Sequence, residues 1–496
     1  MLKSFIAKYL AKFITKKEDK WQANAEQAQQ KLFLAMVKKA QNTEFGKIHH
    51  FREIKTIKDF QERVPLQDYE TLKSYIDQIV EGKENVLWPG KPLYFAKTSG
   101  TTSGTKYIPI SKESMPYHIE AARNALLYYI KNSQNANFVN GKMIFLQGSP
   151  ELEEKNGIKV GRLSGISAHF VPNYLQKNRM PSWETNCIED WETKVDKIVE
   201  ETKHENMTLI GGIPPWLIMY FERLQEKTGK KIKQIFPNLQ LIVTGGVNYE
   251  PYRQKMNELL GGAVDVIQTY PASEGFIAYQ NQLNSEELLL LLDKDIFYEF
   301  VPVDEIGNEN PTRLTIGEVE LNKNYAVIMS TMAGLWAYSI GDTVKFVSKN
   351  PYKIVVSGRI KHYTSAFGEH VIGQEVEKAL ENTLKEFPAL VTEFHVAPEV
   401  APEQGLPYHE WLIEFEQKPE NMEQFAEKLN QEMCAQNVYY DDLIQGKILR
   451  PLVLTTIQKS GFNEYMKTQG KLGGQNKVPR LANDRKLAEP LKQWAE

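Results

Sequence analysis

Four short hydrophobic runs, separated by stretches with helical periodicity, constrain the fold of this chain more than any other feature. The runs occupy residues 143–146, 208–210, 239–243 and 263–267. Strands that are buried on both faces are near-continuous apolar runs, and the helices between them are the crossovers of a parallel sheet. The centre of the chain is therefore predicted to be an α/β domain whose mostly parallel sheet is covered by helices on both faces.

The regions on either side of this centre have different patterns. Residues 1–85 show helical periodicity, as in 26–39 and 59–69, and predict helices that pack against the core. Apolar and polar residues alternate at 314–321, and an apolar run follows at 325–331. These two segments predict a β-rich subdomain after residue 300.

A separate unit begins near Arg359. Its expected elements are a helix, two strands, a helix and a strand, at residues 373–386, 393–397, 410–415, 422–435 and 451–456. This order is typical of a small α+β module of ferredoxin-like character. Because 496 residues exceed what one hydrophobic core usually supports, we expect a large N-terminal domain at 1–358 and a small, mobile C-terminal domain at 359–496.

Charge and cysteine content narrow the function. The 60 basic and 63 acidic residues give a net charge of −3, which offers no electrostatic case for nucleic acid as a partner. The two cysteines, Cys187 and Cys434, are far apart and lack metal-ligand neighbours. They suit a reducing cytoplasm, where we expect this protein, and they indicate no zinc site.

The first 21 residues have apolar side chains at helical spacing with lysines between them. An amphipathic helix that docks on the protein is the favoured interpretation, and a helix on a membrane surface is the alternative. The apolar stretches are too short and too interrupted for a signal peptide or a spanning helix, so no stable membrane insertion is expected.

A glycine- and hydroxyl-rich run between Lys97 and Lys106 predicts a phosphate-binding turn. Its glycines let backbone N–H groups approach an anion, and its hydroxyls add donors. The residues are Thr98, Ser99, Gly100, Thr101, Thr102, Ser103, Gly104, Thr105 and Lys106. The spacing is not that of a P-loop, because Thr105 separates Gly104 from the lysine and Pro109 prevents a following helix. A flexible linker is the alternative, but strand-like residues on both sides favour a structured turn.

Three later motifs suit a nucleotide. Thr244-Gly245-Gly246-Val247 follows a buried strand, and its backbone suits contact with a planar ring. In the loop expected at 269–275, Tyr270 can stack on a base, Thr269 or Ser273 can donate to an α-phosphate, and Glu274 can hold Mg²⁺. Asp342 can accept ribose hydroxyls. The alternatives are a proline-containing turn with a solvated glutamate, and an aspartate that caps a tight turn.

Two basic residues complete the set. Gly358-Arg359 precedes the C-terminal unit, and Lys477 lies in a glycine-rich tail. A movable lysine can close over a reacting carboxylate and stabilise the charge that develops there.

The order of these motifs resembles that of the adenylate-forming superfamily. The phrases at 98–104, 338–342 and 474–480 are most similar to the auxin-responsive Gretchen Hagen acyl-acid amido synthetases of plants and their bacterial relatives. The resemblance implies that ATP and a carboxylic acid form an acyl-adenylate and pyrophosphate, and that the amine of an amino acid then displaces AMP.

The resemblance also implies a role for each motif. The loop from Thr98 to Lys106 would hold the β- and γ-phosphates. Adenine would lie against Tyr270 and the turn Gly245-Gly246-Val247, while Asp342 would hold the ribose and Glu274 the metal. The small domain would rotate about Arg359, and Lys477 would be the cation of the adenylation step.

Some features leave alternatives open. Ser339 stands where many superfamily members have arginine, so that arginine contact is not expected here. An acyl-CoA ligase shares the first half-reaction, and a catalytically idle nucleotide-binding protein would keep the same fold. Segments 163–171 and 214–216 are expected to line the substrate pocket, although His169 and Trp216 suit a structural core equally well. The phosphate-binding loop is expected to be mobile without ATP.

Overall fold

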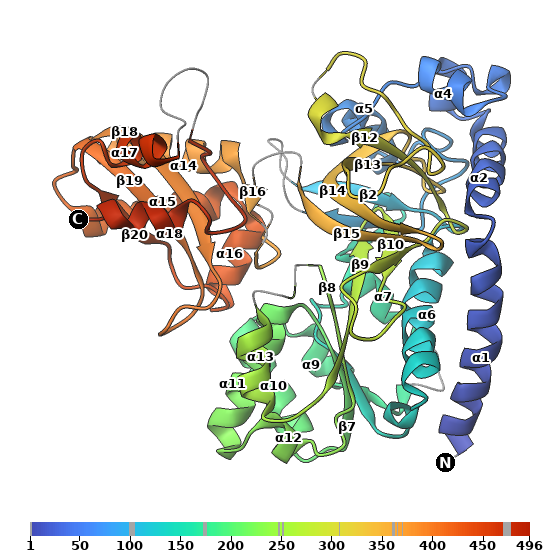
Figure 1. Ribbon diagram of the computed structural model, residues 1–496, viewed down its shortest axis with the longest axis horizontal. Helices are drawn as coiled ribbons and strands as arrows, with labels where there is room; N and C mark the ends of the chain where they lie inside the picture. The colour runs from blue at the N-terminus through green and yellow to red at the C-terminus, as the bar shows by residue number, and fades with distance from the viewer. Residues whose placement is uncertain are drawn as a thin grey trace.

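The computed structural model describes residues 2–98, 105–171, 176–246, 249, 252–306, 308–359, 363–364, 366–369, 371–469 and 478–496. Figure 1 shows a body that is coloured blue to light orange and a C-terminal unit, orange to red, beside it. Among the described residues, no helix combines the length and the apolar character that crossing a bilayer requires.

The N-terminal region is helical, as predicted. Its helices are α1 (Leu2–Gln22), α2 (Ala25–Ala40), α3 (Glu44–Ile48), α4 (Ile57–Arg63) and α5 (Tyr69–Val80), with the 3₁₀ turn η1 (Phe51–Glu53). The helix expected at 59–69 is wrong, because α4 ends at Arg63 and α5 begins after Asp68. Pro65 disfavours a continued helix, and Asp68 forms a capping box with Thr71 that starts the next one.

The central sheet has 11 strands in the order β12-β13-β14-β15-β11-β10-β9-β8-β7-β3-β6. Its parallel part confirms the four predicted strands, which are β3 (Lys142–Phe145), β7 (Met207–Gly211), β8 (Leu241–Gly245) and β9 (Asp265–Ala272). The edge strand β6 (Arg179–Met180) pairs with β3.

Helices cover both faces of this parallel part. On one face, Ile210 and Ile242 pack in a cluster with residues of α10 (Trp191–Thr202), α11 (Pro214–Thr228) and α13 (Arg253–Leu260). On the other, Leu209 and Leu241 pack with residues of α6 (Met115–Ser133). Adjacent residues on a strand face opposite sides, so continuous apolar strands serve two hydrophobic cores. Shorter helices nearby are α7 (Leu163–Ala168), α9 (Trp183–Cys187), α12 (Ile232–Ile235) and η2 (Asn137–Asn140).

The other half of the sheet is antiparallel and forms the predicted β-rich region. It consists of β10 (Gly275–Tyr279), β11 (Leu288–Leu290), β12 (Ile296–Pro302), β13 (Asn324–Thr331), β14 (Tyr338–Lys349) and β15 (Tyr352–Arg359). The 3₁₀ turn η4 (Val303–Glu305) follows β12.

The strand predicted at 314–321 is wrong. Only single bridges form, at Leu314 and Leu321. Between them, the Glu318 carboxylate accepts hydrogen bonds from the amide and the hydroxyl of Thr315, which favours a turn. Ile316 and Val319 are buried. The alternation of apolar and polar residues at 314–321 therefore belongs to a loop that packs on the core.

A separate sheet carries the glycine-rich loop. Its strands, in the order β2-β1-β5-β4, are β2 (Lys106–Ile110), β1 (Tyr94–Thr98), β5 (Ile158–Gly161) and β4 (Glu153–Lys155). The predicted strands on both sides of the loop are therefore confirmed, and they pair antiparallel as β1 and β2.

The C-terminal unit contains a three-stranded sheet in the order β18-β19-β20. The predicted helices and strands are confirmed as α14 (Gly373–Glu386), β18 (Leu390–Glu399), β19 (Tyr408–Gln417), α15 (Met422–Gln436) and β20 (Val453–Ile457). Further elements are β16 (Tyr363–Thr364), β17 (Val371–Ile372), α16 (Val438–Gln445), α17 (Gly461–Thr468), α18 (Ala488–Leu491) and η5 (Lys492–Trp494).

Candidate active site

The hairpin of β1 and β2 holds the two ends of the glycine-rich loop side by side. Thr98 is the register partner of Lys106. The Lys106 ammonium lies 5.3 Å from the centre of the Tyr69 ring, which is a cation–π contact. Thr105 is exposed. The residues Ser99, Gly100, Thr101, Thr102, Ser103 and Gly104 lie outside the described residues, so their phosphate contacts and their mobility remain predictions.

Tyr69 and Gln67 connect this hairpin to the motif of Asp342. The Tyr107 amide donates to the Tyr69 hydroxyl at 2.9 Å, and the Ser339 amide donates to the Gln67 carbonyl at 2.8 Å. Burial raises the pKa of Tyr69 to about 12, so its hydroxyl stays protonated at neutral pH. Sequence reasoning missed both residues, because neither belongs to a motif and only the tertiary fold brings them here.

Gly245 and Gly246 form a turn at the end of β8. Gly245 is the register partner of Thr269 on β9, and a Cβ atom on Gly245 would lie 2.4 Å from the Thr269 carbonyl oxygen. Gly246 has a φ of +83°. Glycine alone meets both requirements without strain, so this turn presents bare backbone, as contact with a planar ring requires. Val247 lies outside the described residues.

The predicted adenine and ribose residues touch each other. Tyr270, 9% exposed, donates its hydroxyl to Oδ2 of Asp342 at 2.5 Å. Asp342 follows Gly341, whose φ is +83°, and its backbone is the register partner of Arg359 on β15. A hydrogen bond to a carboxylate is stronger than a neutral one, so this contact fixes the orientation of the aspartate.

Glu274 lies in the turn between β9 and β10. The segment 269–275, expected to be a loop, is instead a strand, a tight turn and the start of the next strand. Thr269 donates its hydroxyl to the Thr244 carbonyl at 3.1 Å, whereas Ser273 and Glu274 are half-buried in the turn. Hairpin pairing of β9 with β10 is the reason for the difference.

The described residues hold no group of three or more His, Cys, Asp or Glu side chains that could bind a metal. A single glutamate still fits Mg²⁺ chemically, because this ion is often bound through one or two carboxylates together with substrate phosphates and water.

The C-terminal unit contacts the base of the glycine-rich loop. Tyr439 of α16 donates its hydroxyl to the carbonyl oxygen of Lys97 at 2.9 Å, directly before Thr98. Arg162, which precedes α7, forms an ion pair with Asp442 of α16. The Arg162 guanidinium carbon lies 5.0 Å from the centre of the Tyr439 ring. Sequence reasoning missed these residues, since nothing local marks a contact between distant segments.

A second contact joins the C-terminal unit to the glycine turn. A Cβ atom on Gly246 would lie 3.3 Å from Ile213 Cγ2, and one on Gly368 would lie 3.7 Å from Ile213 Cδ1. The Ile213 side chain therefore lies between Gly246 and Gly368. Lys477 lies outside the described residues, and its catalytic role remains a prediction.

His169 and Trp216, from the segments expected to line the substrate pocket, both make structural contacts. Nε2 of His169 lies 2.8 Å from the Pro150 carbonyl oxygen. Trp216 packs on Trp191 with ring centres 4.3 Å apart. Both contacts agree with a structural role for these two side chains. That segments 163–171 and 214–216 line the substrate pocket remains a prediction.

Comparison with known proteins identifies the family. Three family models match the chain in order: the GH3 family N-terminal domain at residues 15–188, the central domain at 289–359 and the C-terminal domain at 374–486. Jasmonoyl–L-amino acid synthetase JAR4 of Nicotiana attenuata is 23% identical over 358 residues, which are 58% of this chain and 60% of that protein. This chain thus aligns with less than two thirds of the tobacco relative.

Other similarities extend over nearly the whole chain. Indole-3-acetic acid-amido synthetase GH3.4 of Arabidopsis thaliana is 22% identical over 545 residues, covering 93% of this chain and 90% of that protein. The solved structure of GH3.15 acyl acid amido synthetase superposes with a TM-score of 0.62 at 15% identity, covering 99% of this chain and 96% of that one. The fold is shared, and the chain belongs to the GH3 family, as its motifs predicted.

Proposed function

We propose that this protein is an ATP-dependent acyl-acid amido synthetase. It activates a carboxylic acid as an acyl-adenylate with release of pyrophosphate, and then transfers the acyl group to the amine of an amino acid. The hydrogen bond between Tyr270 and Asp342 carries this proposal, because it joins the predicted adenine and ribose residues in one place. Membership of a family whose named relatives are amido synthetases supports it.

The chain's own residues supply binding and orientation. The bare turn at Gly245 and Gly246 lies against adenine, and Asp342, oriented by Tyr270, accepts the ribose hydroxyls. The loop from Thr98 to Lys106 donates N–H and O–H groups to the leaving pyrophosphate. Such donors stabilise the charge that develops as the α-phosphate is attacked.

Glu274 is our candidate ligand for Mg²⁺. When bound, this ion neutralises phosphate charge and thereby favours the departure of pyrophosphate. Thr269 and Ser273, in the same strand and turn, are candidate donors to the α-phosphate.

Residues 359–496 are proposed to be the domain that moves between the two half-reactions. In the adenylation step, Lys477 neutralises charge at the reacting carboxylate. For the second step, contacts such as Tyr439 with Lys97 bring this domain against the loop that held the pyrophosphate. Motion of a whole domain lets one site serve two chemical steps.

A pyrophosphate-release screen tests the proposal. Purified protein, ATP and Mg²⁺ are combined with a library of carboxylic acids crossed with amino acids, and acid-dependent pyrophosphate release is expected. Lys477→Ala should suppress release, while Lys486→Ala, an exposed lysine nearby in sequence, should not. In a parallel reaction that contains CoA as well as the amino acids, mass spectrometry of the product separates an amide from a CoA thioester. The absence of acid-dependent pyrophosphate release with every acid of the library would refute the proposal.

A further inference from the structure

The N-terminal helix α1 presents large apolar side chains on the face that points away from the protein. At 3.6 residues per turn, Phe5, Tyr9 and Phe13 form one line, with Ile6 and Leu10 beside it. These five side chains are 70%, 68%, 65%, 47% and 44% exposed in that order. Figure 1 shows α1 along the outer edge of the molecule. Contiguous apolar groups of this kind are rare on soluble proteins unless something binds them.

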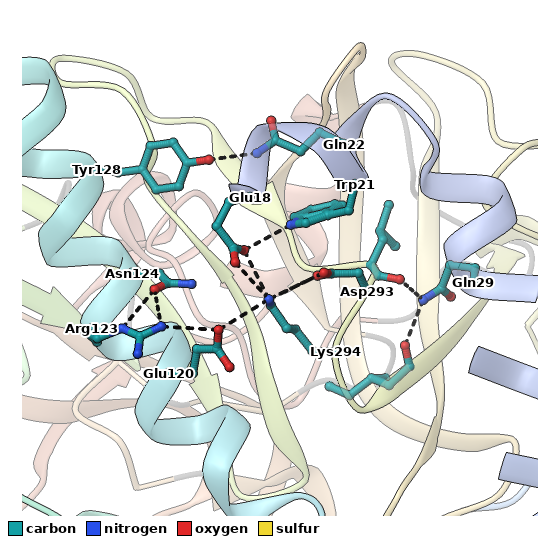
Figure 2. Close-up of polar contacts among 12 residues, drawn as sticks. Glu18, Trp21, Gln22, Gln29, Glu120, Arg123, Asn124, Tyr128, Asp293 and Lys294 are labelled. Carbon is teal, nitrogen blue, oxygen red and sulfur yellow. Dashed lines mark hydrogen bonds and ion pairs between the residues drawn. The ribbon is translucent and has the colours of Figure 1, made fainter. Parts of the chain in front are cut away.

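The opposite face of α1 is already packed on the N-terminal domain. Ala11 and Thr15 are buried, and the Ser4 hydroxyl donates to the Ala136 carbonyl at 3.2 Å. Near the end of the helix, Oε2 of Glu18 lies 3.1 Å from the Lys294 ammonium (Figure 2). Docking on the protein therefore explains one face of the helix and leaves the other without an explanation.

The outer face is also positively charged. Residues 2–17 contain no Asp or Glu. Of their five lysines, Lys3 donates to Asn178 of the body at 3.0 Å, while Lys8, Lys12, Lys16 and Lys17 are exposed. The first acidic residues, Glu18 and Asp19, pair with Lys294 and Lys131 of the protein body. This local positive charge contrasts with the net charge of −3 for the whole chain.

We propose that this outer face, made of Phe5, Ile6, Tyr9, Leu10 and Phe13 with the neighbouring lysines, binds the surface of a bilayer that contains anionic phospholipids. Aromatic and aliphatic side chains on one side of a helix, with lysines around them, are typical of helices that lie in the membrane interface. The lysines attract anionic head groups, and the apolar side chains enter the boundary with the acyl chains.

A second copy of the chain is a less suitable occupant. Two such faces in contact would bring two lysine-rich helices together, and the like charges would repel each other. Attachment to lipid is peripheral, in agreement with the lack of a spanning helix among the described residues.

Vesicle sedimentation with the full chain tests this proposal. The probes are vesicles of phosphatidylcholine alone and vesicles that also contain phosphatidylserine. We expect the protein to sediment with the anionic vesicles, and raising the salt from about 0.1 M to about 1 M should weaken binding because it screens the lysines. The triple variant Phe5→Ser, Tyr9→Ser, Phe13→Ser should bind more than about tenfold more weakly, since each buried aromatic side chain contributes a large apolar area.

Two further variants make the test specific. Lys12→Glu with Lys16→Glu should also weaken binding by more than about tenfold, because each lysine near an anionic surface contributes about fivefold. A control triple, Ile48→Ser, Leu321→Ser and Leu390→Ser, removes apolar side chains that are 53%, 47% and 55% exposed elsewhere, and it should bind like the unmodified protein. Unchanged thermal unfolding of each variant shows that its fold is intact.

Three results would overturn the proposal. One is a protein that stays in the supernatant with both kinds of vesicle. Another is equal loss of binding in the helix triple and the control triple. The third is a dimer, seen by sedimentation velocity without lipid, that the helix triple abolishes, since this face would then be covered by a second copy.

Discussion

At the scale of single residues, the candidate site depends on one hydrogen bond between two motifs that are distant in sequence. Tyr270 orients Asp342 through a 2.5 Å contact. An aspartate that accepts two ribose hydroxyls must present both oxygens in a fixed direction, and the tyrosine hydroxyl supplies that constraint. The contact therefore predicts a measurable effect on nucleotide affinity.

Tyr270→Phe should raise the KM for ATP about fivefold in pyrophosphate exchange, because a hydrogen bond to a charged group contributes roughly 1 kcal/mol or more. Asp342→Asn should have a larger effect. Tyr298→Phe is the matched control, since its buried hydroxyl has no hydrogen-bond partner among the described residues. An unchanged KM in Tyr270→Phe would show that the hydroxyl has no part in nucleotide binding.

Asp295 makes the stability of the protein depend on pH. Its side chain is 1% exposed, and burial raises its pKa to about 7. In the unfolded chain the pKa of this carboxyl is about 4, so the folded state binds the proton more tightly. Tighter proton binding by Asp295 in the folded state adds to the free energy of unfolding. This contribution is fully present below about pH 4 and is lost as the pH rises to about 7, because a buried charge must then form.

Asp295→Asn should therefore stabilise the protein at about pH 8 by roughly 2 kcal/mol and have little effect at about pH 4.5. Urea unfolding at both pH values measures the difference. Asp190→Asn serves as the control, because Asp190 is an exposed N-cap and asparagine caps helices equally well. The same gain at both pH values would contradict the assignment.

At the scale of elements, the sequence predicts strands and helices best where one periodicity dominates. The four parallel strands are recognisable because each is apolar on both faces. The segment with Ile316 and Val319 shows the limit, since a loop that packs on the core has the same alternation as a strand. Motif residues such as Gly245 are recognisable locally, whereas Gln67, Tyr69 and Tyr439 reach the candidate site only through tertiary contacts.

The buried Lys294 adds an ion pair to the packing of α1 on the body. Its ammonium lies 3.1 Å from Glu18 on α1, 3.7 Å from Glu120 on α6 and 3.3 Å from Asp293. Figure 2 shows these three carboxylates around the lysine. A second lysine, Lys131, also pairs with α1, through Asp19, but this pair is solvent-exposed. The two lysines thus allow a buried ion pair to α1 to be compared with an exposed ion pair to the same helix.

Lys294→Met should lower the free energy of unfolding by about 3 to 5 kcal/mol, because it leaves the buried Glu18 carboxylate without a counter-ion. Lys131→Met should cost less than about 1 kcal/mol, since exposed ion pairs contribute little. Urea denaturation gives both values. Adding Glu18→Gln to Lys294→Met should restore part of the loss, and equal losses in the two single variants would show that burial of the pair is irrelevant.

At the scale of the whole molecule, the contacts between the C-terminal unit and the body belong to one arrangement of the two. Asp442 pairs with Arg162 at the start of α7, and Tyr439 reaches the carbonyl of Lys97. A second, more exposed pair joins Lys447 to Glu192. We propose that residues 359–496 move relative to the body between the two half-reactions. A contact that exists in only one arrangement should then affect the rate of only the half-reaction that takes place in that arrangement.

Tyr439→Phe should slow amide formation about fivefold, because one hydrogen bond of roughly 1 kcal/mol is lost in the arrangement that we assign to acyl transfer. Asp442→Asn should act in the same direction. Pyrophosphate exchange, which reports adenylation alone, should keep its rate in both variants. Lys447→Met is the control and should leave both activities near their original values, since its ion pair is exposed. A parallel fall in exchange and amide formation would assign these contacts to the fold as a whole rather than to the second half-reaction.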